Sequence, residues 1–220
     1  MTAGSASSVC ILVLDAAGTP RRWIGVEDAA GYYCRAMVAW DLGEHSFTLH
    51  GGTNRASGVR STLTLRSIVA VRGGNPRRAL RPAPPAVVRE MLFARDRFLC
   101  AYCGGCYRHS ELTADHVHPQ SRGGRTIWTN LVSACKACNL RKANRTPEQA
   151  HMPLLYVPYV PSLHEAFILR NRRILADQME FLMAGVPAGS RLHAVDGNNA
   201  AILPVRGSAR GGGFDGSFAA

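Results

Sequence analysis

The sequence lacks any long hydrophobic run. Its most apolar early stretch, residues 9–14, is far shorter than the roughly 20 apolar residues that a membrane-spanning helix requires. Residues 1–8 contain no lysine or arginine, so the basic segment with which an export signal begins is missing. These absences predict a cytoplasmic protein that does not contact a membrane. The sequence also has no internal repeat, which argues against solenoid and propeller architectures.

Acidic residues are too few to balance the basic ones. The 220 residues include 26 lysines and arginines but 15 aspartates and glutamates, so the formal net charge is +11 and the sequence pI is near 9.9. Such a charge favours a polyanionic partner such as nucleic acid. The basic side chains cluster in the middle of the chain, at Arg77, Arg78, Arg81, Arg89, Arg95, Arg97, Arg122, Arg125, Lys136, Arg141, Lys142 and Arg145. This clustering is typical of a surface that follows a phosphate backbone.

Seven cysteines are present, and four of them form two Cys-x-x-Cys pairs, Cys100/Cys103 and Cys135/Cys138. Each pair makes a tight turn in which both sulfurs point the same way, and a tetrahedral Zn²⁺ requires two such turns facing each other. Gly104, directly after the first pair, can adopt the positive φ that the turn favours. We therefore predict that the four thiolates hold a structural Zn²⁺, which closes the loop between the pairs.

Other interpretations of the cysteines remain open. Cys106 has the same spacing from Cys103, and His109 offers a nitrogen ligand, but either choice would leave Cys100 without a role. A thiol-redox protein would need an exposed cysteine with a lowered pKa. A disulfide framework would need an oxidising compartment, which nothing in the sequence indicates.

Residues that carry chemistry lie between and just after the cysteine pairs. Residues 112–119 read LTADHVHP, a short strand in which Asp115 and His116 point to opposite sides or diverge at the strand's end. A Gly-Gly loop, then Asn130, and then Asn139 after the last cysteine follow in order. This order, Asp-His-x-x-Pro, Gly-Gly, Asn-Leu and Cys-x-x-Cys-Asn-x-x-Lys, resembles the HNH endonuclease family with its ββα-metal fold. The resemblance covers about residues 90–148.

The resemblance implies a metal-dependent endonuclease that hydrolyses DNA, of the stand-alone bacterial and phage type. His116 stands at the position of the family's first motif residue, Asn130 at the middle one, and Asn139 where a histidine is frequent. The chain is thus similar to a His-Asn-Asn variant. Asn130 is expected to tie the loop behind His116 through its side-chain amide.

The residue types suit phosphodiester hydrolysis. His116 can act as general base, because an imidazole titrates close to neutral pH. Asp115 and Asn139 supply oxygen ligands for a divalent cation and leave positions for water and phosphate. An amide binds transition metals less well than an imidazole does, so Mg²⁺ or Mn²⁺ is expected at the catalytic position while the zinc stays structural.

Several residues near this motif are candidate contacts for nucleic acid. The expected phosphate contacts are Arg122, Arg125, Arg141 and Lys142, and a solvated helix face is the alternative for the last two. His118 is a candidate second ligand of the metal or a candidate phosphate contact, and the alternative is an exposed loop residue. The alternative function is a zinc-dependent nucleic-acid-binding module without hydrolysis. The complete set of Asp115, His116 and Asn139 favours catalysis.

The chain as a whole is predicted to be α+β. Residues 1–74 form a small α+β unit, with a buried strand at 9–14, a helix at 27–36 and strands at 37–42, 46–50 and 62–72. A similar leader precedes the catalytic motif in many stand-alone HNH proteins. Residues 75–85 are a basic, proline-rich linker, either an arm along nucleic acid or a spacer. Residues 86–150 are the nuclease module and begin with a helix at 86–96.

The C-terminal part is predicted to be a helical extension, residues 151–188, followed by a disordered tail, residues 189–220. Ser162 is expected to cap one long amphipathic helix that runs to about residue 183. This helix either packs on the nuclease core or pairs with a second copy, which would make a homodimer. The Gly/Ala/Ser-rich composition from residue 189 onward is typical of disorder.

Overall fold

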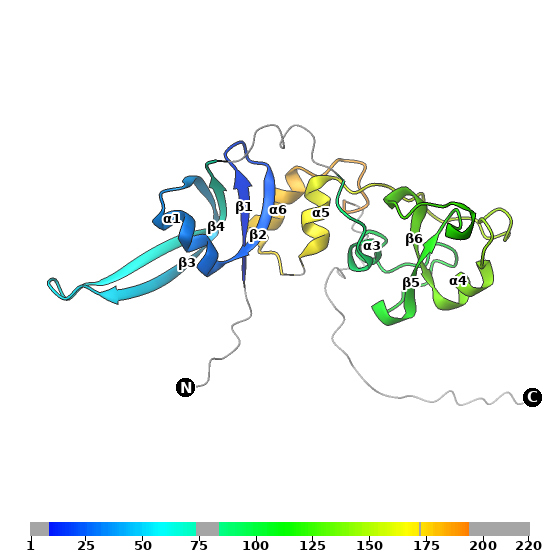
Figure 1. The fold of residues 1–220 in the computed structure, drawn as a ribbon, viewed down its shortest axis with the longest axis horizontal. Helices are drawn as coiled ribbons and strands as arrows, with labels where there is room; N and C mark the ends of the chain where they lie inside the picture. The colour runs from blue at the N-terminus through cyan, green and yellow to red at the C-terminus, as the bar shows by residue number, and fades with distance from the viewer. Residues whose placement is uncertain (1–8, 74–83, 172, 194–220) are drawn as a thin grey trace, which may run out of the picture.

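The computed structural model of the protein describes residues 9–73, 84–171 and 173–193. Most of the predicted linker, with Arg77, Arg78 and Arg81, and the tail from residue 194 onward lie outside the described residues. The fold is mixed α+β, as predicted, with a sheet at one end, two helices in the middle and the cysteine-rich half at the other end (Figure 1). Within the described ranges, no helix is long and apolar enough to cross a membrane.

The N-terminal half is built on a four-stranded sheet in the order β2-β1-β4-β3. The central strand β1 (Cys10–Asp15) pairs antiparallel with β2 (Pro20–Gly25) and parallel with β4 (Arg60–Val71), which pairs antiparallel with β3 (Val38–Thr53). Helix α1 (Val26–Cys34) covers one face of the sheet, and C-terminal helices cover the other. A strand covered on both faces must be apolar throughout, which explains the continuous apolar run.

Strands β3 and β4 form a longer hairpin than the sequence indicated. The two strands expected at residues 37–42 and 46–50 are one strand, because the pairing with β4 shifts register between Leu42 and Ser46 without a turn. Gly43 lies within this irregularity. The hairpin extends past α1, and its tip lies at one end of the molecule (Figure 1).

The prediction of one long helix after Ser162 is wrong. The segment forms two short helices, α5 (Leu163–Arg170), which Ser162 caps as expected, and α6 (Ala176–Ala184). The break lies at Asn171, whose side-chain oxygen accepts a hydrogen bond from the backbone N–H of Arg173 at 3.0 Å. Such a local bond competes with helix continuation, and it frees the two helices to face different partners.

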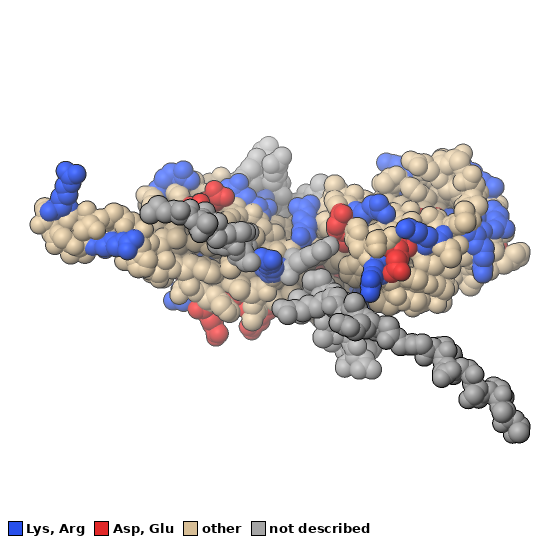
Figure 2. Space-filling view, turned by 90° about the horizontal axis from the view of Figure 1, so that it is seen from below, with Lys and Arg blue, Asp and Glu red and all other residues tan. Residues whose placement is uncertain are grey.

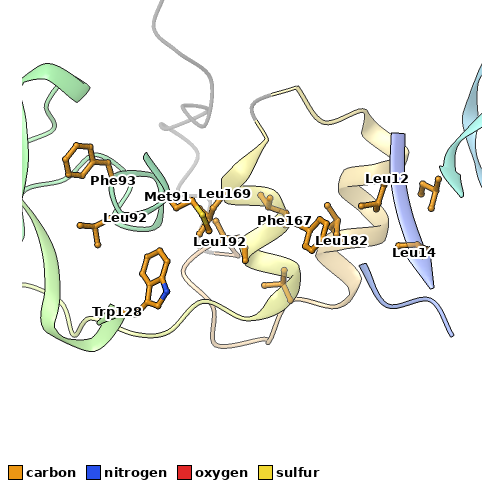
Figure 3. Packing of buried hydrophobic residues seen from close by; sticks show 14 of the residues in the cluster. Leu12, Leu14, Met91, Leu92, Phe93, Trp128, Phe167, Leu169, Leu182 and Leu192 are labelled. Carbon is orange, nitrogen blue, oxygen red and sulfur yellow. The ribbon is translucent and has the colours of Figure 1, made fainter. Parts of the chain in front are cut away.

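One continuous apolar core joins the sheet to the cysteine-rich half. Helix α5 lies between β1 and α3 (Arg89–Arg95) (Figure 3). Trp23 of β2 donates a hydrogen bond from Nε1 to the carbonyl of Phe167 on α5 at 3.2 Å. Residues 189–193, expected to begin the disordered tail, are ordered onto this core through Leu192, which is 9% exposed. The C-terminal extension therefore packs on the rest of its own chain.

The cysteine-rich half contains a ββα unit. Strands β5 (Leu112–His116) and β6 (Leu131–Cys135) pair antiparallel, and helix α4 (Lys136–Lys142) follows β6 directly. Three 3₁₀ turns surround them, η1 (His109–Glu111), η2 (Gln120–Arg122) and η3 (Trp128–Asn130). Because Cys135 ends β6 and caps α4, no loop separates the strand from the helix.

Arg95 was expected on a phosphate-binding surface, but it is buried. Its guanidinium pairs with Asp96 at 2.8 Å, and Asp96 in turn accepts the backbone N–H of Ser133 at 2.7 Å. Arg95 also donates to three backbone carbonyls, those of Trp128, Leu131 and Tyr159. A buried charge is tolerated only with such complete pairing, so this group links α3 to β6 instead of contacting solvent.

Asp177 ties α6 to the hairpin side of the sheet. Its Oδ2 accepts hydrogen bonds from the Ser67 hydroxyl at 2.6 Å and the His45 backbone N–H at 3.1 Å. Burial raises the pKa of Asp177, but the hydrogen bonds from Ser67 and His45 outweigh burial and lower the pKa to about 2. We predict that Asp177→Asn lowers the free energy of unfolding by about 2 kcal/mol at neutral pH, because hydrogen bonds to a charged carboxylate are lost.

The pH dependence of this effect has a defined sign. The carboxyl has an ordinary pKa of 3.8, so its contribution is complete above about pH 4 and disappears as the pH falls through about 2. Urea unfolding of wild type and Asp177→Asn across this range measures the difference. Glu180→Gln, at an exposed position on the same helix, is the control and should match wild type. A wild-type advantage that stays constant down to pH 2 would contradict this account.

Candidate metal centre and active site

The sulfurs of Cys100, Cys103, Cys135 and Cys138 all lie within 4.8 Å of one another. A tetrahedral Zn²⁺ with Zn–S bonds of about 2.3 Å fits among sulfurs at this separation. The first pair lies in the turn after α3, and the second joins the end of β6 to the start of α4. In the part of the chain that the structure describes, no other group of three or more His, Cys, Asp or Glu side chains is placed to hold a metal. The cluster supports a structural zinc.

Local geometry favours a thiolate at Cys103, the exposed member of the first pair. Gly104 has a φ of +72°, as the turn after the first pair was predicted to need, and its N–H donates to the carbonyl of Cys100 at 2.9 Å. The Tyr107 hydroxyl lies 3.5 Å from the sulfur of Cys103, and this contact is the main cause that lowers the pKa of Cys103 to about 6. A thiol with a lowered pKa is more easily deprotonated for metal binding.

The two alternative ligands lie outside the cluster. Cys106 is exposed and forms an isolated β-bridge with Leu99. The ring of His109 faces Glu90 on α3, with Nε2 3.7 Å from the carboxylate. The geometry therefore favours the four cysteines of the two Cys-x-x-Cys pairs.

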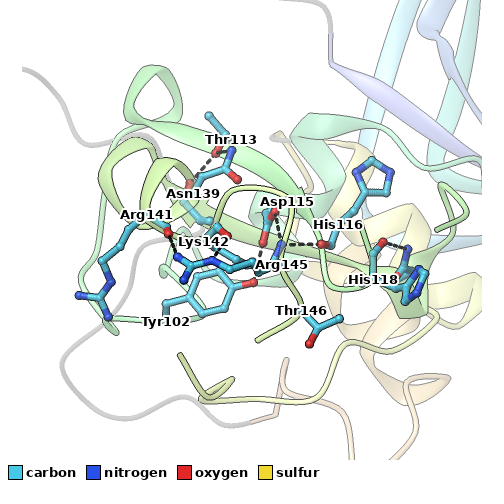
Figure 4. A network of polar contacts seen from close by, with 12 residues as sticks. Tyr102, Thr113, Asp115, His116, His118, Asn139, Arg141, Lys142, Arg145 and Thr146 are labelled. Carbon is cyan, nitrogen blue, oxygen red and sulfur yellow. Dashed lines mark hydrogen bonds and ion pairs between the residues drawn. The ribbon is translucent and has the colours of Figure 1, made fainter. Parts of the chain in front are cut away.

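Helix α4 packs against β5 through two polar pairs. Residues two apart on a strand share a face, and residues three apart on a helix do the same, so Thr113 and Asp115 oppose Asn139 and Lys142. Asn139 donates from Nδ2 to the Thr113 hydroxyl at 3.0 Å, and the Lys142 ammonium contacts Asp115 Oδ1 at 2.9 Å (Figure 4). This face holds both residues that were predicted to bind a catalytic cation.

Asp115 is buried, and each of its carboxylate oxygens has a partner. Its second oxygen, Oδ2, accepts a hydrogen bond from the Tyr102 hydroxyl at 2.5 Å. Burial, and then the neighbouring carboxylate, raise the pKa of Tyr102 well above its usual range, so the phenol stays protonated and donates. Tyr102 lies between Cys100 and Cys103, and it therefore joins the cysteine cluster to the acidic site. No pattern in the sequence predicted this contact.

Lys142 does not lie where a phosphate contact was expected. Its side chain is 1% exposed, and its ammonium also donates to the carbonyl of His116 at 2.8 Å. Such a buried ammonium requires a paired carboxylate, which Asp115 provides. We therefore do not assign Lys142 to the nucleic-acid surface. It anchors Asp115 and the backbone of His116 together.

The imidazole of His116 points away from Asp115, as expected for neighbours on a strand (Figure 4). Its Nε2 lies 3.0 Å from the hydroxyl of Thr126, a residue of the loop between η2 and η3. No pattern in the sequence singled out Thr126. A hydroxyl two residues after the Gly-Gly pair was the available signal.

Asn130 ties that loop together. Its side chain accepts from the N–H of His118 at 2.8 Å and donates to the carbonyls of His118 and Arg125 at 3.1 and 2.9 Å. Gly124 packs so closely that an added Cβ would lie 1.9 Å from the His118 carbonyl oxygen. These contacts have the form expected of a supporting residue behind His116. Any part of Asn130 in catalysis stays a prediction.

Comparison with known protein families identifies this unit. Residues 100–155 match the family model described as HNH endonuclease. By this match, residues 100–155 form an HNH domain. An HNH domain implies a nucleic-acid substrate and suggests nuclease activity. No curated protein matches the chain.

The surface of the HNH domain carries the other predicted contacts. Arg122, Arg125 and Arg141 are exposed, and Figure 2 shows basic side chains over this end of the molecule. Arg122 donates to the side chain of Gln149 at 2.7 Å, which keeps its guanidinium at the surface. His118 is also exposed, beyond the end of β5. This position agrees with the alternative of an exposed loop residue.

We predict that the HNH domain loses its zinc and its fold when one cluster cysteine is changed. In Cys138→Ser the remaining three thiolates bind Zn²⁺ more weakly, because one of four ligands is gone. Elemental analysis of the purified full chain should give about one zinc per chain for wild type and much less for the variant. Cys106→Ser is the matched control and should keep its zinc. Equal zinc content in Cys138→Ser and wild type would refute the four-thiolate site.

Proposed function

We propose that the HNH domain is a metal-dependent endonuclease that hydrolyses DNA phosphodiester bonds. The observation that carries the proposal is the family match over residues 100–155, the segment that contains Asp115, His116 and Asn139. The net charge of +11 agrees with a polyanionic substrate. The exposed arginines at positions 122, 125 and 141 are proposed phosphate contacts.

His116 is proposed as the general base. Its Nε2–H donates to the Thr126 hydroxyl across 3.0 Å in the tautomer that we assign, which leaves Nδ1 unprotonated. Nδ1 then accepts a proton from the attacking water. The backbone of His116 is held on one side by Lys142, and the following loop is held by Asn130. The ring is thereby oriented without a charged partner.

Asp115 and Asn139 are the proposed ligands of a catalytic Mg²⁺ or Mn²⁺. Each carboxylate oxygen has two lone pairs, so Asp115 can accept from Lys142 and Tyr102 and still offer an oxygen. Asn139 uses its amide nitrogen on Thr113, so its oxygen is left for a ligand role. When bound, such a cation neutralises phosphate charge and stabilises the leaving oxygen. A site with one carboxylate suits ions that keep several waters.

A second candidate function is a zinc-dependent nucleic-acid-binding module that does not hydrolyse its ligand. The observation that favours it is the closed contact of Asp115 with both Lys142 and Tyr102, which already engages both carboxylate oxygens. In that case, the network would serve only to hold α4 against β5.

We predict that purified wild type nicks or linearises supercoiled plasmid only when Mg²⁺ or Mn²⁺ is added. His116→Ala should lose at least about a hundredfold in rate, because general-base catalysis contributes about that much or more. It should keep its zinc, since the ring contacts none of the cluster cysteines. Plasmid cleavage on agarose gels, with zinc content measured in parallel, is the assay.

The same assay separates the two candidate functions. If both proteins bind DNA and neither cleaves it with any divalent cation, the binding module replaces the nuclease. If His116→Ala cleaves as fast as wild type, the assignment of the base is overturned.

Thr126 is predicted to act through His116. Thr126→Val removes the hydroxyl but keeps the shape, and it should lower kcat by about tenfold with little change in KM, because the ring loses orientation rather than substrate contact. Thr126→Ser keeps a hydroxyl and should restore most of the rate. Equal rates for the Val and Ser variants would mean that the contact at Nε2 has no part in catalysis.

A further inference from the structure

The hairpin of β3 and β4 carries a basic arm that the HNH domain does not include. The arm is defined here as residues 46–66, the part of the hairpin around its tip. Its sequence contains Arg55, Arg60, Arg66 and His50 and has no aspartate or glutamate. In a chain with 15 acidic residues, this stretch is uniformly neutral or basic. Figure 2 shows arginine side chains and no acidic ones on the visible face of the arm.

The pairing register separates the arm into two faces. Side chains at directly paired positions share a face, so Phe47 with Leu65 and Leu49 with Leu63 form one face. These residues pack in the same apolar cluster as Ala29 of α1.

The opposite face of the arm is polar. It is formed by three cross-strand pairs, Ser46 with Arg66, Thr48 with Thr64 and His50 with Thr62. All six residues are exposed, and each can donate a hydrogen bond from its side chain. A row of hydroxyl, imidazole and guanidinium donors without a carboxylate suits a ligand rich in anionic acceptors.

Two more arginines lie nearer the tip of the arm. Arg55 makes no hydrogen bond or ion pair with any described residue and lies in the turn between the strands. Arg60 donates from Nε to the carbonyl of Gly51 at 3.1 Å, which directs its side chain across the ribbon. The chain's nearest acidic residues, Asp41 and Glu44, precede the arm on β3. Both guanidinium groups are therefore unneutralised.

The stability of the fold accounts for the part of the arm that packs on α1, but not for its extension to the tip. A two-stranded ribbon is marginally stable by itself, and its edges expose unpaired backbone groups. β3 has 16 residues, about three times the usual strand length of 5–6 residues. Beyond α1 the ribbon covers no part of the core that joins the sheet to the HNH domain.

We propose that the polar face of this arm binds the phosphate backbone of duplex DNA, away from the position that the HNH domain contacts. The inference rests on the proposed function for its choice of polyanion. A two-stranded ribbon also fits the major groove of B-DNA, which is about 12 Å wide. A second copy of this chain is a poorer partner, because two basic arms on chains of net charge +11 repel each other. The DNA then lies along the long axis of the molecule (Figure 1).

The arm is tested by binding, independently of cleavage. The full-length, zinc-loaded His116→Ala chain is titrated into a labelled duplex of about 40 base pairs. Fluorescence anisotropy at several KCl concentrations gives the slope of log Kd against log salt. Adding Arg55→Ala and Arg60→Ala should reduce that slope by about 1.8, since each phosphate contact contributes about 0.9.

The control removes two exposed arginines elsewhere, Arg170→Ala at the end of α5 with Arg173→Ala between α5 and α6. This control should reduce the slope by less than the arm variant does. Thermal melting shows whether each variant keeps its fold.

Each outcome decides the proposal. An unchanged slope in a folded arm variant, or an equal loss in the control, overturns it. Loss of binding to RNA or to an acidic protein, with duplex DNA unaffected, overturns it as well. Plasmid cleavage by the arm variant in an otherwise wild-type chain tests the nuclease separately. Cleavage that persists at saturating DNA with a reduced salt slope supports both proposals.

Discussion

The HNH domain depends on the mutual approach of four thiols. Two strands of five residues and a helix of seven residues are too small to bury a core by themselves, and hairpins of this size are marginal in water. The sulfurs lie within 4.8 Å of one another, and a metal held there joins the turn after α3 to the junction of β6 and α4. Since Cys135 caps α4, the position of the cluster also sets the position of the helix.

The polar contacts around β5 follow from that constraint. Once α4 lies against the strand, its helical spacing brings Asn139 to Thr113 and Lys142 to Asp115. Tyr102, inside the first cysteine pair, closes the other side of Asp115. The cysteine cluster and the acidic site are thus parts of one hydrogen-bonded unit. Disorder at the thiols would displace the partner of the Asp115 carboxylate, because Tyr102 lies within the first cysteine pair and donates a hydrogen bond to Asp115.

The C-terminal helices give the molecule its overall arrangement. Helix α5 packs on α3 on one side and on the N-terminal sheet on the other, so the basic arm and the HNH domain belong to one body. The buried pair of Arg95 and Asp96 continues this connection into β6. A rigid link matters for the proposed DNA path. The arm and the HNH domain would bind the same duplex, and binding at one strengthens binding at the other only when their separation is fixed.

The sequence by itself determined the features that depend on spacing along the chain. The two cysteine pairs, the buried strand β1, the cap at Ser162 and the order of the HNH motif all follow from residues a few positions apart. Only the tertiary structure decided which side chains meet across elements. It placed Lys142 and Arg95 in the interior, brought Thr126 to His116, and ended α5 at Asn171. The sequence does not show whether a basic side chain lies on the surface or in the interior. The difference is made by a carboxylate such as Asp115, which lies 27 residues from Lys142 along the chain and 2.9 Å from its ammonium in the fold.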